Sequence, residues 1–524
     1  MSAPSSIINV CSGVLLNNDY LHTIWFGSHS EQLAYFAGKV VKTFSAYTYI
    51  RKSWSIKVEA TMEQARTWSY LYFKNGNGKT YFYFINNIEY INDHTVELFI
   101  EMDVMQTYLQ EYTLHPCFVE REHSATDEIG EHTQDEGLDT GEIIVQDVSH
   151  VTNLNDLCIL IQSTINPNTT AKVLGSTHHG VFSGMGIYAV DMKDVTAWAT
   201  KLSELSEGHI DAIVNMWMYP KSLVNLASEA EWDEANLCKV VSGVYEIDFT
   251  KTKKKVLNDS YVPDNNKLLC YPYNFLYCTN NAGDSAVYHY ERFQNNSCQF
   301  TVSGAIAPDG TVKMYPVYYK GASENYDEGL TLTDFPTCAW NADMYKLWLA
   351  QNRHSQNLAI ATGLGMMAGG AVATLTTGGV GGIAGVGTFT AGLSQISGLL
   401  AQRKDMEIQP PQARGAYSAN VNVAQGKHTF SFYFKSITKE NARKLDNFFS
   451  LYGYKCNRVK VPNRNVREKW TYTKTVDCHV SGNLCTEDLR KIQSIYDKGI
   501  TFWKNGDLIG SYLDANGNMT NNCL

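Results

Sequence analysis

Two glycine-containing patterns in the sequence could serve nucleotide chemistry. Gly363-Leu364-Gly365-Met366-Met367-Ala368 matches the dinucleotide fingerprint G-x-G-x-x-A, and Gly78-Lys79-Thr80 matches the end of a phosphate-binding loop. The fingerprint needs an acidic residue about 20 positions later, but the next acid is Asp405. The phosphate-binding loop needs a glycine where this chain has Phe73. Both patterns are incomplete, so we expect no nucleotide cofactor.

Other chemistry-bearing residues are present without the spacing that catalysis requires. The stretch 150–340 contains no G-x-S-x-G, H-E-x-x-H or kinase motif, although it holds many carboxylates. The 12 cysteines include no C-x-x-C pair, which argues against a zinc ribbon or a redox motif. Their spread is typical of reduced thiols in a protein made in a cytoplasm. We therefore predict a protein that is not an enzyme and that has no metal and no cofactor.

Histidines gather in one acidic stretch, residues 115–142. His115, His123 and His132 lie there among nine Asp and Glu residues. Histidine titrates near neutral pH, so a pH-sensitive latch is one interpretation. An exposed polar loop is the simpler interpretation, and we favour it.

The composition excludes several classes of protein. Lys and Arg number 43 against 53 Asp and Glu, a net charge of −10, which does not suit a protein that grips nucleic acid. Charged residues make up only 18% and hydrophobic residues 44%, so most of the chain must fold. The 32 tyrosines and 21 phenylalanines favour strands and large subunit contacts.

One segment departs from this composition. No Asp, Glu, Lys, Arg or His occurs between Ser355 and Gln402, and residues 358–401 hold 12 of the 39 glycines. A charge-free run longer than about 18 residues is typical of a membrane-spanning segment. A single helix of this length would extend about 66 Å, too long for a hydrocarbon core of ~30 Å. The segment is therefore predicted to divide into two apolar arms around a glycine-rich tip.

The predicted membrane-penetrating residues are the large apolar side chains of the two arms. They are Leu358, Ile360, Leu364, Met366, Met367, Val372, Leu375, Val380, Ile383, Val386, Phe389, Leu393, Ile396, Leu399 and Leu400. The predicted tip consists of Gly378, Gly379, Gly381, Gly382, Gly385 and Gly387. Small residues at G-x-x-x-G spacing let helices approach closely in lipid, whereas glycine weakens a helix in water. A buried core hairpin and a constitutive membrane anchor remain alternatives.

The flanking sequence is rich in strand patterns. Residues 70–84 form a predicted β-hairpin around Asn75-Gly76-Asn77-Gly78, and residues 96–105 alternate like a strand. Near the end of the chain, predicted helices run from Thr438 to Gly453 and from Thr486 to Gly499, and strand 500–503 follows. These patterns predict a mainly β protein with α+β elements.

Several blocks, in this order, resemble one family. They are Asn18-Asp19-Tyr20 with Ile24-Trp25-Phe26, Glu101-Met102-Asp103-Val104-Met105-Gln106-Thr107, Arg121-Glu122-His123 with Asp135-Glu136-Gly137-Leu138, Trp348-Leu349-Ala350-Gln351-Asn352, Phe448-Phe449-Ser450-Leu451-Tyr452-Gly453-Tyr454, and Gly499-Ile500-Thr501-Phe502-Trp503. They are similar to the distal tail tube, or tail knob, proteins of small protein-primed short-tailed phages of the picovirus type. The matches cover roughly residues 14–145 and 341–505.

The resemblance implies a tail-tube-like β-barrel domain built from N- and C-terminal parts, with an extra middle domain and a long glycine-rich hydrophobic loop. The expected domains are 1–150 and 421–524 for the tube, 151–340 for the middle domain, and 341–420 for a helical lead-in and the loop. The resemblance also implies a homohexamer at the tail tip of a virion assembled in the host cytoplasm. Its expected partners are other tail proteins (a lower collar or proximal tube and a tip protein), viral DNA passing without sequence recognition, and the host membrane.

Three functional hypotheses follow. In the first, the loops plug the lumen and then penetrate the host membrane for genome ejection. In the second, the chain is a plain tail tube or adaptor whose apolar loop only seals subunits. In the third, residues 150–340 carry a tail-associated cell-wall hydrolase, which scattered Asp and Glu residues permit.

Overall fold

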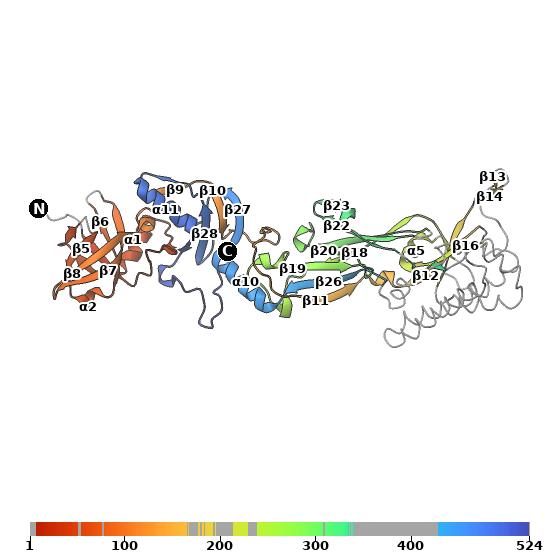
Figure 1. Cartoon of the computed structure of the whole chain (residues 1–524), viewed down its shortest axis with the longest axis horizontal. Helices are drawn as coiled ribbons and strands as arrows, with labels where there is room; N and C mark the ends of the chain where they lie inside the picture. The colour runs from red at the N-terminus through yellow and green to blue at the C-terminus, as the bar shows by residue number, and fades with distance from the viewer. Residues whose placement is uncertain are drawn as a thin grey trace, which may run out of the picture. The chain divides into compact units, whose positions relative to one another are not determined.

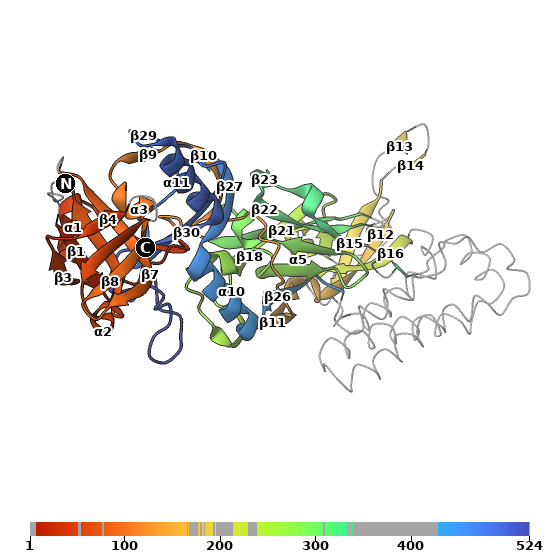
Figure 2. The ribbon, with the colours of Figure 1, turned by 60° about the vertical axis from the view of Figure 1, so that its left-hand side comes forward.

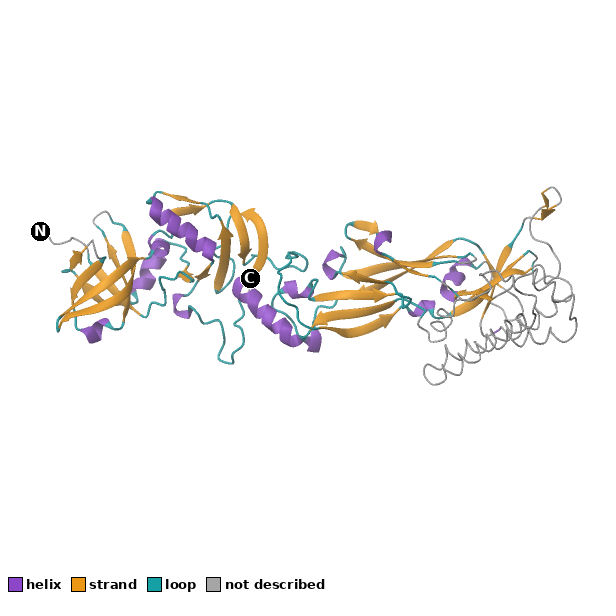
Figure 3. Cartoon of the chain, in the orientation of Figure 1, coloured by secondary structure: helices purple, strands orange, loops and turns teal. Residues whose placement is uncertain are grey.

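A computed structural model describes residues 7–50, 54–75, 78–164, 166, 177–178, 181–182, 184–191, 194, 213–228, 238–307, 310–333, 335, 337–338 and 428–522. Strands dominate these residues, as Figure 3 shows in orange. The chain divides into two compact units. The first unit comprises Met1–Glu142, Val256–Tyr273 and Ile437–Leu524, and the second comprises Ile143–Lys255 and Asn274–Ser436. The first unit therefore combines N-terminal and C-terminal parts of the chain.

The first unit contains a curled seven-stranded sheet, drawn in red and orange in Figure 2. Its order is β3 (Val40–Phe44), β1 (Ile8–Ser12), β6 (Trp68–Lys74), β7 (Thr80–Asn92), β8 (Thr95–Met102), β5 (Ser55–Glu59) and β4 (Thr48–Ile50). A five-stranded sheet has the order β2 (His22–Ile24), β30 (Ile500–Trp503), β28 (Trp470–Val476), β10 (Cys117–Glu122) and β27 (Tyr454–Lys460). A third sheet pairs β29 (Val480–Gly482) with β9 (Tyr112–Leu114).

The predicted hairpin at 70–84 is confirmed. Tyr70 pairs with Phe84 across β6 and β7, and the amide of Gly78 donates to the carbonyl of Asn75 at 3.0 Å. Gly78 has a φ of +85°, which a glycine adopts without steric cost. The Gly78-Lys79-Thr80 pattern thus belongs to a hairpin turn.

The strand predicted over 96–105 ends earlier, at Met102. Asp103 caps the short helix α3 (Val104–Thr107), because its Oδ1 accepts hydrogen bonds from the amides of Met105 at 3.0 Å and Gln106 at 3.1 Å. Its Oδ2 accepts from the hydroxyl of Tyr70 at 2.8 Å. The prediction was too long because the alternation of apolar and polar residues continues through Val104, although Asp103 already caps a helix.

The two C-terminal helices are confirmed. Helix α10 (Lys439–Tyr452) buries Ala442, Leu445 and Phe449 and ends at Gly453, which has a φ of +66°. The N-cap of helix α11 (Thr486–Lys498) is Cys485, one residue before Thr486, where the helix was predicted to start. The helix ends at Gly499, as predicted. The other helices of this unit are α1 (His29–Ala37), α2 (Met62–Ala65), η4 (Asn258–Ser260), η5 (Asn266–Leu269) and η9 (Gly506–Leu508).

The second unit is built from antiparallel sheets around one core (Figure 1). One sheet has the order β11 (Ile143–His150), β26 (Ser431–Ile437), β19 (Asn274–Thr279) and β20 (Ser285–Tyr288). Another has β17 (Cys238–Val240), β15 (Gly186–Asp191), β12 (Leu157–Ser163), β16 (Ile213–Pro220) and β25 (Thr337–Cys338). A third has β18 (Val244–Thr252), β21 (Ser297–Ala305), β22 (Val312–Tyr319) and β23 (Ala322–Glu324), with β24 (Leu330–Leu332) also on β22.

Smaller elements complete this unit. They are the hairpin of β13 (Thr177–His178) and β14 (Val181–Phe182), helix α5 (Lys221–Ala227), and the turns η1 (Thr152–Leu154), η6 (Tyr290–Arg292) and η7 (Tyr326–Glu328). In the described parts of the whole chain, no helix is long and apolar enough to cross a bilayer.

Candidate functional site

The two chain segments that flank residues 339–427 meet in the core of the second unit. The rings of Phe335 and His428 lie edge to face, with their centroids 4.7 Å apart. Phe335 is 7% exposed and His428 is 4% exposed, and Phe335 also contacts the ring of Tyr219 at 5.2 Å. Burying a side chain of this size contributes about 1.5–3 kcal/mol. The described residues on either side of 339–427 therefore meet at one buried place, which we call the Phe335–His428 clasp.

Hydrogen bonds hold the downstream side of the clasp. The hydroxyl of Thr429 donates to the carbonyl of Val151 at 2.7 Å, and the amide of Val151 donates to the carbonyl of Phe430 at 3.0 Å. The amide side chain of Asn281 donates to the carbonyl of Thr429 at 2.9 Å. Phe430 itself is fully buried. These contacts join the start of β26 to the residues after β11 and after β19.

The residues predicted to enter a membrane all lie outside the described residues. This holds for the apolar arm residues and for the glycine tip between Leu358 and Leu400, as well as for the G-x-G-x-x-A pattern. Strand β25 and the clasp are the described structure nearest to them in sequence. Sequence reasoning missed it, because neither Phe335 nor His428 belongs to a motif.

The acidic stretch 115–142 contains strand β10 and then, from His123, a loop that is largely exposed as predicted, but some of its acidic side chains are buried. The side chain of Glu136 is fully buried, and its carboxylate pairs with Arg121 and with Lys267, whose Nζ lies 2.8 Å from Oε1. The same carboxylate accepts from the amide of Lys455 at 3.0 Å. A carboxylate with this many partners can remain charged when buried. Sequence alone could not find these partners, because Lys267 and Lys455 are remote in the chain.

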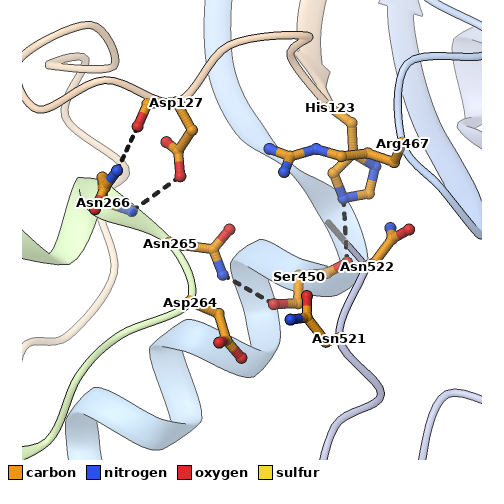
Figure 4. Close-up of a pocket in the computed structure, with 9 residues that line it drawn as sticks. All are labelled: His123, Asp127, Asp264, Asn265, Asn266, Ser450, Arg467, Asn521 and Asn522. Atoms are coloured by element: carbon orange, nitrogen blue, oxygen red, sulfur yellow. Dashed lines mark hydrogen bonds between the residues drawn. The ribbon is translucent and has the colours of Figure 1, made fainter. Parts of the chain in front are cut away.

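A polar cavity of about 240 Å³ lies beside this stretch in the first unit (Figure 4). It is lined by His123, Asp127, Asp264, Asn265, Asn266, Ser450, Arg467, Asn521 and Asn522. Asp127 Oδ1 accepts from the hydroxyl of Tyr454 at 2.7 Å, and its Oδ2 accepts from the amide of Asn266 at 3.0 Å. Arg467 is 6% exposed, and its Nε and Nη2 have no hydrogen-bond partner among the described residues. The cavity thus gives a buried guanidinium room for solvent.

His123 in this cavity cannot act as a titrating latch. Burial, the nearby Arg467 charge and Arg121 lower the pKa of His123 to about 3, despite its hydrogen bonds to carbonyl groups. Its Nδ1 accepts from the amide of Tyr472 at 2.8 Å, so Nε2 carries the proton, 3.1 Å from the carbonyl of Ser450. The ring is neutral and both nitrogens are occupied. It offers neither a general base nor a metal ligand.

The described residues also show how possible metal ligands and cysteines are arranged. Among the described residues, no group of three or more His, Cys, Asp or Glu side chains is positioned to hold a metal ion. The ten cysteines with described side chains form no disulfide among the described residues.

Comparisons with known proteins agree with this architecture. Residues 238–517 match the family model described as the C-terminal domain of Bacillus phage phi29 tail knob protein gp9, and residues 4–113 match the caudoviral major tail protein N-terminus. The tail knob protein gp9 of Bacillus phage B103 is 24% identical, and that of Bacillus phage PZA is 26% identical. Each comparison covers 96% of this chain and 97% of the relative.

A solved structure has the same fold. The tail knob protein gp12 of bacteriophage C1 superposes with a TM-score of 0.61 at 17% identity, over 96% of this chain and 97% of that one. The mainly β fold and these matches define a structural protein of a phage tail rather than an enzyme. The chain belongs to the family of the Bacillus phage phi29 tail knob protein gp9. Its place is in the tail of the virion.

Proposed function

We propose that this chain forms a homohexameric tube at the tail tip that conducts viral DNA, and that its apolar segment 358–401 plugs the lumen and later penetrates the host membrane. The observation that carries this proposal is the charge-free segment of 44 residues, 358–401. The residues that precede and follow it contact each other at the Phe335–His428 clasp. Because the residues before and after it meet at the clasp, a change of conformation in this segment need not unfold the core of the second unit.

Physical chemistry favours two environments for this segment. Large apolar side chains avoid water, so they gain from shelter in a lumen before release and from lipid after release. In lipid, the backbone must satisfy its own hydrogen bonds, so each arm is expected to become helical. The net charge of −10 suits a conduit, because DNA slides more freely past a wall that does not bind its phosphates.

Dye leakage from liposomes tests the membrane step. We would compare the intact chain with a deletion of 358–401 and with a variant carrying Leu364→Asp, Val372→Asp, Leu393→Asp and Ile396→Asp. Each charge at the centre of an inserted helix costs about 2.5–3.5 kcal/mol, so leakage should be lost. A matched control carries Thr374→Ser, Thr376→Ser, Thr388→Ser and Thr390→Ser in the same segment and should leak like the intact chain. Equal leakage by the deletion would refute the membrane role of the segment.

Negative-stain electron microscopy tests the assembly independently. End views should show six-fold rings, with density in the lumen of the intact protein and an open lumen in the deletion. Rings that never leak liposomes at pH 5 or pH 7 would favour a plain tube or adaptor, in which the apolar segment only seals subunits. A compact monomer would contradict the tube itself.

A further inference from the structure

Two imidazole rings lie next to each other in the first unit, tilted by 45°. His115 follows β9 and His479 precedes β29, and the amide of His115 donates to the carbonyl of His479 at 2.9 Å. The paired residues Leu114 and Val480 continue the same antiparallel register. Side chains directly opposite each other in such a ladder project from the same face. The ring centroids of His115 and His479 are 5.1 Å apart.

Ser481 fixes the orientation of one of these rings. Its Oγ lies 2.6 Å from Nε2 of His115. Histidines that bind metals usually donate their second ring N–H to an oxygen in this way, which leaves the other nitrogen with a lone pair. When Nε2 of His115 donates to Ser481, the free lone pair is on Nδ1.

The separation of the ring centres leaves room for a shared metal ion between the two rings. With metal–nitrogen bonds of ~2.0–2.1 Å, an ion would lie about 3.2 Å from each ring centre. Ring centres 5.1 Å apart then give a nitrogen–metal–nitrogen angle of roughly 105°, near the tetrahedral value. His479 is exposed, so its ring can turn toward the ion at little cost.

We propose that His115 and His479 chelate a divalent transition-metal ion, with Ser481 as the positioning residue. Imidazole nitrogen suits Zn²⁺, Ni²⁺ and Cu²⁺, whereas Mg²⁺ and Ca²⁺ prefer oxygen. Because no third ligand of the His, Cys, Asp or Glu type joins the pair among the described residues, water would fill the other positions. The bound ion would tie the residues after β9 to those before β29, two segments remote in sequence.

Titration calorimetry of the metal-stripped full chain with NiCl₂ and with ZnCl₂ tests the site. His479→Ala and His115→Ala should each lose one equivalent of bound metal. Ser481→Ala should keep the equivalent but bind it about tenfold to 100-fold more weakly, as changes to such orienting groups do. The matched control is His94→Ala, which removes an exposed, single imidazole from the turn between β7 and β8.

Thermal melting supplies a second readout. Metal should raise the Tm of the native chain and of His94→Ala, because an ion that binds only the folded state stabilises it. It should leave the Tm of His479→Ala unchanged. Full stoichiometry and affinity in both His115→Ala and His479→Ala would overturn the proposal, as would an equal loss in His94→Ala. Unchanged affinity in Ser481→Ala would overturn the role given to the serine.

Discussion

The Nζ of Lys267 lies 2.8 Å from Oε1 of Glu136, and only 4% of the lysine side chain and none of the glutamate side chain is exposed. This ion pair joins the segment 256–273 to the acidic stretch 115–142 inside the first unit. Lys267 also donates to the carbonyl of Gln134 at 2.6 Å. These two contacts of Lys267 fix the acidic stretch 115–142 to the rest of the first unit.

Replacing the lysine should destabilise the first unit strongly. Lys267→Met keeps most of the side-chain volume but leaves the buried Glu136 with only Arg121 as a charged partner. Removing one partner of a buried pair costs about 3–5 kcal/mol, and denaturant unfolding measures this loss. Lys39→Met is the matched control, since its pair with Asp507 has a similar distance of 2.7 Å but is more exposed. Its loss should stay below about 1 kcal/mol. Equal losses in both variants would contradict the burial argument.

A second prediction concerns how much the Phe335–His428 clasp contributes to the stability of the second unit. Phe335→Ala should reduce the free energy of unfolding by about 3–5 kcal/mol, because it removes a buried ring from the core of the second unit. Phe335→Leu should lose less, since it retains most of the apolar contact. Val244→Ala in the same unit alters a side chain that is 65% exposed and should change stability by about 0.5 kcal/mol or less.

The clasp variant also bears on the proposed membrane step. If the clasp keeps the two ends of the segment together, Phe335→Ala should release dye from liposomes faster than the native chain at the same concentration. Val244→Ala should not change the rate. A Phe335→Ala protein with normal leakage would separate the clasp from the control of the segment.

The carboxyl of Asp103 predicts a pH dependence. Burial raises its pKa from the ordinary 3.8 to about 6, against the effect of the hydrogen bonds from Gln106, Tyr70 and Met105. The folded state therefore holds this proton more tightly than the unfolded state. The resulting stabilisation is full below about pH 4 and is lost as the pH rises through 6.

Asp103→Asn isolates this contribution, because asparagine also caps helices well. Between pH 4 and pH 7, the stability of the variant relative to the native chain should rise by up to about 3 kcal/mol. Urea unfolding at several pH values measures this difference. A difference that stays constant or falls with increasing pH would show that the buried carboxyl does not titrate in this range.

Local patterns in the sequence predicted the elements whose signals are local. The hairpin around Gly78 and the helices that end at Gly453 and Gly499 follow from turn chemistry and apolar spacing within about 15 residues. The end of β8 was misplaced, because the apolar alternation ran on through Val104 and gave no sign that Asp103 would cap a helix. Whether Asp103 caps a helix depends on the space that the neighbouring strands leave for its carboxylate. The alternation of apolar and polar residues in the sequence does not contain this information.

The candidate site was less accessible to sequence reasoning. The apolar segment stands out by composition alone, but the contact between Phe335 and His428, which precede and follow it, is made only in the folded core. The buried acids of the otherwise exposed acidic stretch were missed for a similar reason. Glu136 looks like any exposed acid until Arg121 and Lys267 are placed around it. The family was indicated by the order of short sequence blocks along the chain. The hydrophobic and charge patterns alone did not indicate it.

The divided first unit also bears on how the protein is made. Strand β2 near the beginning of the chain pairs in parallel with β30, and their core joins Ile24 to Phe502. A ribosome releases the first partner long before it synthesises the second. The N-terminal strand β2 therefore lacks its partner strand, and Ile24 lacks part of its core, until the residues of the second unit have been translated.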